Sequence, residues 1–203
     1  MTIIQEIKES YRKGSTLHKL IYINVGVFLA LHVGVIFLVL LNQIDRDQSV
    51  NVILDYLAVP ANLGDLARRP WTIFTYMITH GHLYHILFNM LILYWFGRFF
   101  IEEFSLKKLT GVYVLGGLAG AVFFIFFYNL LPFFEELRDV SILTGASASV
   151  MAVVFAVANY VPNRRMNLVF IGQVKIIYLA LIIFVMSTLL EFTDNTGGKI
   201  AHI

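Results

Sequence analysis

The chain contains 203 residues, of which 59% are hydrophobic and only 14% are charged, and its mean hydropathy is +0.78. An average soluble domain is nearer half apolar and a quarter charged, so this composition predicts a protein that crosses a membrane several times. The absence of cysteine excludes a disulfide framework, a thiolate zinc site and a cysteine nucleophile. The formal net charge of +2 becomes informative only when the charges are assigned to the two sides of a membrane.

The first part of the chain changes from polar to apolar. Residues 1–19 mix basic and acidic side chains, which predicts a short cytoplasmic N-terminal segment. Residues 20–41 carry no charge and are long enough to cross the hydrocarbon core, so they form the first predicted span. Residues 42–72 are half apolar, and we expect them to lie in the membrane interface with Tyr56 and Trp71 at headgroup level.

Four more apolar stretches are predicted to span the membrane. They are residues 73–100, 109–131, 145–161 and 176–190. Few residues follow Gly198, whereas a span needs about twenty, so we expect the printed sequence to hold only the start of a sixth helix. The predicted fold is an all-α polytopic membrane domain over residues 20–203, a helical bundle of five full transmembrane helices plus the start of a sixth.

The fourth predicted span carries small residues at regular spacing. Ala148, Ala152 and Ala156 recur every four residues, which places them along one face of a helix. The third span carries Gly116 and Gly120 at the same spacing. Small side chains let helix backbones approach closely inside lipid, so we expect the fourth helix to lie at the centre of the bundle with close neighbours.

The same helix begins with residues suited to nucleophilic chemistry. Gly145 allows a tight entry turn, and Ser147 follows in the first turn, where unpaired backbone N–H groups favour negative charge. A serine hydroxyl beside such donors is a candidate acyl-transfer nucleophile with part of its oxyanion hole in place. The alternative is that Thr144 and Ser147 only cap the helix. Ser149 is a rival nucleophile, but it points about 200° away from Ser147 around the helix.

The distribution of basic residues predicts the orientation in the membrane. With the N-terminus in the cytoplasm, ten basic residues lie inside and five lie outside, in agreement with the positive-inside rule. The inner set is Lys8, Arg12, Lys13, Lys19, Arg98, Lys107, Lys108, Arg164, Arg165 and Lys175, and the outer set is Arg46, Arg68, Arg69, Arg138 and Lys199. This orientation puts Ser147 and His202 on the outer side at similar depth.

The second predicted span contains polar side chains that are costly in lipid and are therefore candidates for function. His85 and Asn89 lie four residues apart, so they share one helix face and could direct donors at an oxyanion beside the serine. The alternative is that they form structural hydrogen bonds across the bundle. His80, His82 and His85 invite a metal interpretation, but they have no adjacent glutamate and do not share one face, so we expect no metal.

Three motifs on different spans together resemble the rhomboid family of intramembrane serine proteases. They are Gly145-Ala146-Ser147-Ala148 opening the fourth span, His85-Ile86-Leu87-Phe88-Asn89 in the second, and Ala201-His202 opening the sixth. The resemblance implies that Ser147 is the nucleophile and His202 its general base, without a third carboxylate. It also implies an oxyanion hole formed by the Ser147 backbone N–H, His85 and Asn89.

The resemblance further implies a bacterial protein of the cytoplasmic membrane that cleaves single-pass transmembrane substrates near the outer face, without a cofactor. The expected partners are these substrates and membrane lipid. We expect the protein to bind neither nucleic acid nor metal. Trp71 resembles the family's tryptophan in the first loop, but Thr72 stands where an arginine often follows. That departure leaves a loop-anchoring role for this position open.

Two other functions remain as alternatives on the sequence. A non-proteolytic rhomboid-like protein would bind transmembrane helices without cutting them, and truncation of the sixth helix could make the chain such an inactive form. It normally lacks the serine or the histidine, whereas Ser147 and His202 are both present. A small transporter or channel would require paired charges or broken helices near the midplane, and the predicted spans carry His, Asn and Ser instead.

Overall fold

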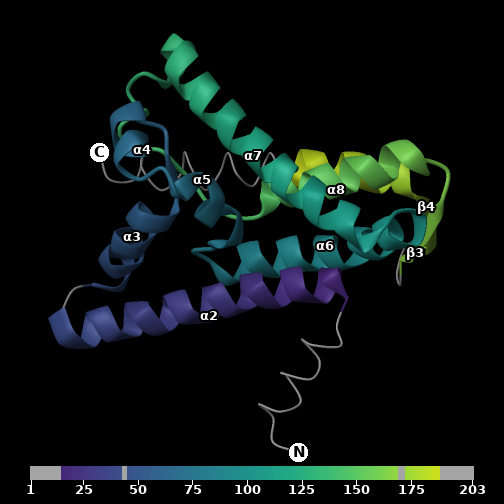
Figure 1. Ribbon diagram of the computed structural model, residues 1–203, viewed down its shortest axis with the longest axis horizontal. Coiled ribbons are helices and arrows are strands. Elements are labelled where there is room, and N and C mark those ends of the chain that lie inside the picture. The colour runs from purple at the N-terminus through teal and green to yellow at the C-terminus, as the bar shows by residue number, and fades with distance from the viewer. Residues whose placement is uncertain (1–14, 43–44, 169–171, 188–203) are drawn as a thin grey trace, which may run out of the picture.

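The computed structural model describes residues 15–42, 45–168 and 172–187, and these residues are mostly helical (Figure 1). The longer helices are α2 (Thr16–Asn42), α3 (Arg46–Leu57), α6 (Leu83–Glu103), α7 (Leu106–Leu130), α8 (Ser147–Tyr160) and a last helix, Ile176–Ser187, drawn in yellow. The short elements are α4 (Leu63–Arg68), α5 (Thr72–Thr75) and the 3₁₀ turns η1 (Tyr76–Ile78) and η2 (Pro132–Phe134). Two small antiparallel pairs complete the fold, β1 (Val59–Pro60) with β2 (Ile142–Leu143) and β3 (Arg165–Leu168) with β4 (Gly172–Lys175).

Among the residues that the structure describes, three helices are long and apolar enough to cross a membrane, and they confirm a helical membrane protein. They are residues Thr16–Leu41, Leu83–Glu103 and Leu106–Leu130. The fourth and fifth predicted spans correspond to shorter apolar helices, Ser147–Tyr160 and Ile176–Ser187, the second of which is described only as far as residue 187. The predicted total of five full spans plus a sixth therefore stays a prediction, and residues 188–203 lie outside the described part.

The second predicted span starts later than the sequence suggested. Residues 73–82 do not continue the helix, because they fold as α5, η1 and a short connection in which Thr79 and His82 have extended backbones. The helix α6 begins at Leu83. His80 lies in this non-helical connection and is fully buried. It therefore precedes α6, the helix that carries His85.

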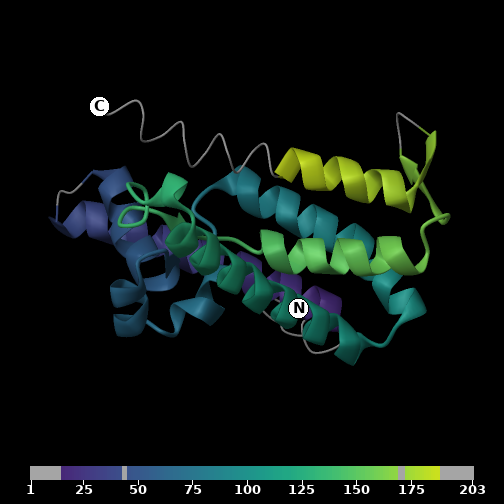
Figure 2. The ribbon, with the colours of Figure 1, turned by 90° about the horizontal axis from the view of Figure 1, so that it is seen from above.

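The predicted close packing of the third and fourth spans is confirmed. A Cβ atom added to Gly116 of α7 would lie 2.2 Å from the Cβ of Ala152 of α8, and one added to Gly120 would lie 2.4 Å from the Cβ of Ala148. The small-residue faces of the two helices therefore meet directly. α8 also contacts α6, and Phe155 of α8 packs against Phe184 of the last helix, so α8 has neighbours on several sides (Figure 2).

The half-apolar connection after α2 is largely helical. α3 packs against α2 through a small apolar cluster of Leu31, Val35 and Leu54. The indole N–H of Trp71 donates to the carbonyl of Tyr56 at 2.8 Å, which ties the start of α5 to the end of α3. Thr72, the residue after Trp71, is buried and donates its hydroxyl to the carbonyl of Arg69.

Arg69 nevertheless anchors the segment between α3 and α5 through its side chain. The Arg69 guanidinium donates to the carbonyl of Asp55 in α3, one residue before the carbonyl that Trp71 contacts. Arg69 also lies 3.9 Å from the carboxylate of Asp65. The anchoring of this segment therefore does not need an arginine at position 72. Its predicted position in the membrane interface stays a prediction.

The β1–β2 pair connects this segment to the entry of α8. Val59 pairs with Leu143, and the N–H of Ala61 donates to the carbonyl of Ser141 at 3.0 Å. The amide of Asn129, near the end of α7, also donates to the carbonyl of Ala61 at 2.9 Å. These bonds hold the chain just ahead of Gly145 against the rest of the bundle.

Candidate active site

At the N-terminal end of α8 the structure brings His85 and His80 to the two residues that precede Ser147. The helix begins at Ser147, and its N-cap residue is Ala146, which provides no side-chain cap. The prediction that Thr144 and Ser147 cap the helix is therefore not supported by the structure. Ser147 occupies the first helical position, where backbone N–H groups have no carbonyl partner within the helix. Its side chain is partly buried.

Gly145 lies directly beneath the ring of His85. Its φ of +96° is in the left-handed region that only glycine adopts without strain. A Cβ atom at this position would lie 2.4 Å from Cε1 and 2.6 Å from Nε2 of His85. Both the backbone conformation and the contact with the ring therefore require glycine, and the contact places His85 of α6 against the peptide that leads into Ser147.

Two hydrogen bonds hold the same turn from below. The N–H of Gly145 donates to the carbonyl of Tyr76 at 3.0 Å, and the N–H of Ala146 donates to Nε2 of His80 at 3.3 Å. Because Nε2 accepts this bond, His80 is neutral with its ring proton on Nδ1. The rings of His80 and His85 meet edge to face with centroids 5.1 Å apart.

Asn89 lies one helical turn beyond His85, as the spacing predicted. It is only 6% exposed, and its side-chain N–H donates to the carbonyl of His85 at 3.0 Å. An amide nitrogen has two N–H donors, so one remains after this bond. Asn89 and His85 thus belong to the same face of α6, a helix that contacts α8.

Ser149 is turned to a different neighbour from Ser147. It is 1% exposed, and its Oγ lies 2.6 Å from the place where a Cβ of Gly117 in α7 would stand, beside the sulfur of Met77. Ser149 is therefore enclosed between α8, α7 and η1. Since the two serines lie about 200° apart around the helix, Ser147 does not share this contact.

Two predicted residues remain, His202 and His82. His202 lies outside the described residues. His82 is exposed at the N-cap of α6, and within residues 15–42, 45–168 and 172–187 no group of three potential ligands is arranged to hold a metal.

Tyr76 was not identified from the sequence, although it supports the site from two sides. Its carbonyl receives the Gly145 N–H, and its hydroxyl donates to the carbonyl of Gly117 at 2.5 Å. A single tyrosine in an apolar stretch carries no signal of such a role. The break of the helix at residues 73–82 would have to be known first.

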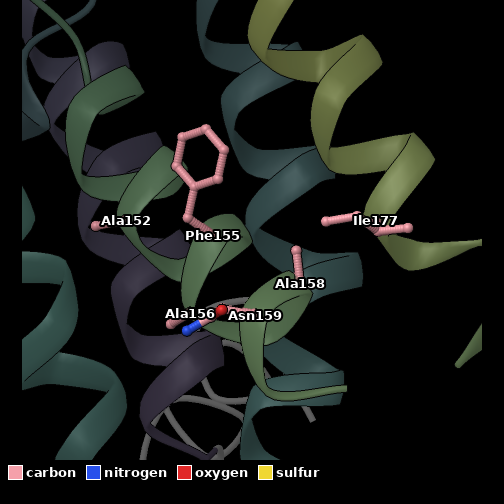
Figure 3. A pocket seen from close by; sticks show the side chains of 6 residues that line it. All are labelled: Ala152, Phe155, Ala156, Ala158, Asn159 and Ile177. Atoms are coloured by element: carbon pink, nitrogen blue, oxygen red, sulfur yellow. The ribbon is translucent and has the colours of Figure 1, made fainter. Parts of the chain in front are cut away.

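A cavity of about 560 Å³ lies farther along α8, facing the start of the last helix (Figure 3). Its lining residues are Ala152, Phe155, Ala156, Ala158, Asn159 and Ile177. None of the predicted site residues lines it. Ala156, the third alanine of the small-residue face, thus borders a cavity.

The fold and the site define the chain as an integral membrane protein with a polar site at the N-terminal end of a central helix. The family model described as Rhomboid domain matches residues 67–203, more than half of the chain, and this range includes Ser147, His85, Asn89 and His202. The chain therefore belongs to the rhomboid family, whose members are in general intramembrane serine proteases. A search of the curated proteins and a search of the solved structures each returned no match.

Proposed function

We propose that this protein is a serine endopeptidase that hydrolyses peptide bonds within or beside transmembrane helices. The observation that carries the proposal is the seating of Gly145 under the His85 ring, which brings the polar face of α6 to the N-terminus of α8 at Ser147. A serine that only capped a helix would not need a histidine packed on the preceding peptide. Membership of the rhomboid family supports the same reaction.

In the proposed reaction, Ser147 and His202 form a catalytic dyad. A serine hydroxyl is a weak nucleophile until a neighbouring imidazole accepts its proton, and His202 is the residue assigned to that role. The Ser147 oxygen adds to the substrate carbonyl carbon, and the proton on His202 then passes to the leaving amine as the peptide bond breaks. Water, activated by His202, hydrolyses the acyl-enzyme and restores Ser147.

The negative charge that develops on the substrate oxygen needs donors fixed before the reaction. The Ser147 backbone N–H is available because it begins the helix, and His85 and the second N–H of Asn89 complete the proposed oxyanion hole. Hydrolysis also requires water at this depth. The polar residues His80, His82, His85 and Asn89 at one end of α6 support a hydrated pocket there.

The proposed substrates are single-pass membrane proteins, cut near the outer face of a bacterial cytoplasmic membrane. Support comes from the predicted inside location of the N-terminus, which puts the start of α8 near the outer side. A non-proteolytic role in binding transmembrane helices is not favoured, because the turn before Ser147 is built around a histidine contact.

The proposal is tested by labelling the purified full chain with a fluorophosphonate probe and by cleavage of a reporter transmembrane substrate. Ser147→Ala should abolish both signals, and His202→Ala should reduce both to background, while the variants still insert into the membrane. Ser149→Ala is the matched control, because its hydroxyl faces α7, and it should keep both activities. Wild-type turnover in Ser147→Ala would show that the nucleophile is assigned wrongly.

A further inference from the structure

A second cavity, of about 460 Å³, lies at the opposite end of α6 from His85. It is formed between the first turn of α2 and the last three turns of α6, and its walls include Leu17, His18, Tyr94, Arg98 and Ile101. In Figure 1 the start of α2 and the end of α6 lie at the same end of the molecule as the β3–β4 hairpin. Nothing in the proposed protease mechanism uses this cavity.

The position of the cavity matches the boundary between lipid and water. The apolar span Thr16–Leu41 begins here and the span Leu83–Glu103 ends here, so the cavity opens at one face of the bilayer. Arg98 and Glu102, which line the cavity, lie near the end of the second of these spans. Long charged side chains near the end of a span extend toward the headgroup level.

Arg98 supplies a positive charge that no described carboxylate neutralises. Its Nη1 donates to the Tyr94 hydroxyl at 3.3 Å, and its guanidinium lies 5.6 Å from the Tyr94 ring centroid. The only ion pairs at this end of the described residues belong to Arg164, which binds Glu102 and Glu103. Glu102 also borders the cavity, and it shares the single charge of Arg164 with Glu103, which leaves Arg98 without a carboxylate partner among the described residues.

The wall opposite Arg98 is the first turn of α2, which borders the cavity. The Ser15 hydroxyl and Nδ1 of the His18 ring lie 2.9 Å apart at this turn, so the wall has polar groups beside the apolar side chain of Leu17. A guanidinium donates strongly to phosphate oxygens, and basic pockets between membrane helices are suited to lipid headgroups.

From these observations we infer that the cavity binds the phosphate of an anionic phospholipid headgroup, with Arg98 as its main ligand. Free phosphate shares this chemistry, but the apolar side chains of Leu17 and Ile101 in the walls and the depth at the end of two spans favour a lipid. The bound lipid would link the start of α2 to the end of α6, at the face of the bilayer away from Ser147.

The inference is tested by native mass spectrometry of the detergent-solubilised full chain titrated separately with phosphatidylglycerol, phosphatidylcholine and inorganic phosphate. Phosphatidylglycerol should bind saturably, and at least about tenfold more tightly than the zwitterionic lipid, because the quaternary ammonium of phosphatidylcholine offsets the charge of its phosphate and weakens the attraction to the guanidinium. Arg98→Gln should weaken phosphatidylglycerol binding about tenfold. Arg165→Gln is the matched control, since Arg165 is exposed on β3 at the same end, and it should leave binding unchanged.

Two results would overturn the inference. Equal weakening by Arg98→Gln and Arg165→Gln would show attraction by general surface charge without a defined site. Binding of inorganic phosphate as tight as that of phosphatidylglycerol would show a site for the free anion. Ser147→Ala should bind the lipid as the wild type does, so the outcome is independent of the proposed protease activity.

Discussion

At the scale of the single residue, the site depends on one peptide that only glycine can form. Gly145 combines a φ of +96° with contact to the His85 ring, and its neighbour Ala146 is held by His80. These contacts fix the direction in which α8 starts, and with it the position of the Ser147 N–H. Donors fixed in advance stabilise charge in a transition state without the cost of reorganisation.

Asn89→Ala should lower kcat on the order of 10²-fold with little change in KM, because an oxyanion donor acts mainly in the transition state. Kinetics on a reporter substrate, normalised by active-site titration with the fluorophosphonate probe, measures this effect. Asn24→Ala is the matched control, since Asn24 is also buried and also donates to the carbonyl four residues earlier, at 2.8 Å, but lies in α2. An equal loss of kcat in both variants would assign Asn89 to structural support.

At the scale of the element, α7 and α8 pack through glycine and alanine where most helix pairs use larger side chains. Gly116 and Gly120 face Ala152 and Ala148 with no room for a further methyl group. Apolar burial gives little drive for association inside lipid, so the close approach of two backbones must supply dispersion contacts instead. This contact also carries α8 to the centre of the bundle, where Ser147 meets α6.

Gly116→Ala should destabilise the protein by about 1–3 kcal/mol, because its new Cβ would overlap the Cβ of Ala152 and force the helices apart. Gly111→Ala provides the control on the same helix, since a Cβ at Gly111 meets no atom within 4 Å. That variant should be neutral or up to about 1 kcal/mol more stable, through helix propensity alone. Thermal unfolding of both variants in detergent gives the comparison, and a stable Gly116→Ala would contradict the tight α7–α8 contact.

At the scale of the whole molecule, the two ends of the bundle differ in chemistry. One end carries the turn before Ser147, the β1–β2 pair and the polar start of α6. The other end carries Arg98, the Arg164 ion pairs and the exposed Arg165. The excess of basic residues at this second end predicts that it faces the cytoplasm.

The orientation can be measured by cysteine labelling, because the chain has no cysteine of its own. Lys107 lies in the first turn of α7 and Glu136 follows its C-terminal end, so they should lie on opposite sides of the membrane. Glu136→Cys should react with a membrane-impermeant maleimide in intact cells, whereas Lys107→Cys should react only after permeabilisation. The reverse pattern would place the N-terminus outside and contradict the basic-residue count.

The sequence by itself determined the membrane class, the helical fold, the family and the facing of small residues on two helices. Each of these properties depends on composition or on the spacing of residues along one helix, and both can be read directly from the sequence. The pairing of His85 with Asn89 was predictable for the same reason, because residues four apart on a helix always share a face. The roles of Ser147 and His202 in catalysis stay proposals.

Only the tertiary structure decided where the second span begins, which serine is enclosed by α7, and what lies over Gly145. The break at residues 73–82, the anchoring of that segment through Arg69 and Trp71, and the support from Tyr76 all depend on contacts between segments far apart in sequence. A hydrophobic period reports which face of a helix is apolar, but it cannot report which neighbour that face meets. The start of α8 is fixed by such neighbours, because its own sequence provides no capping side chain.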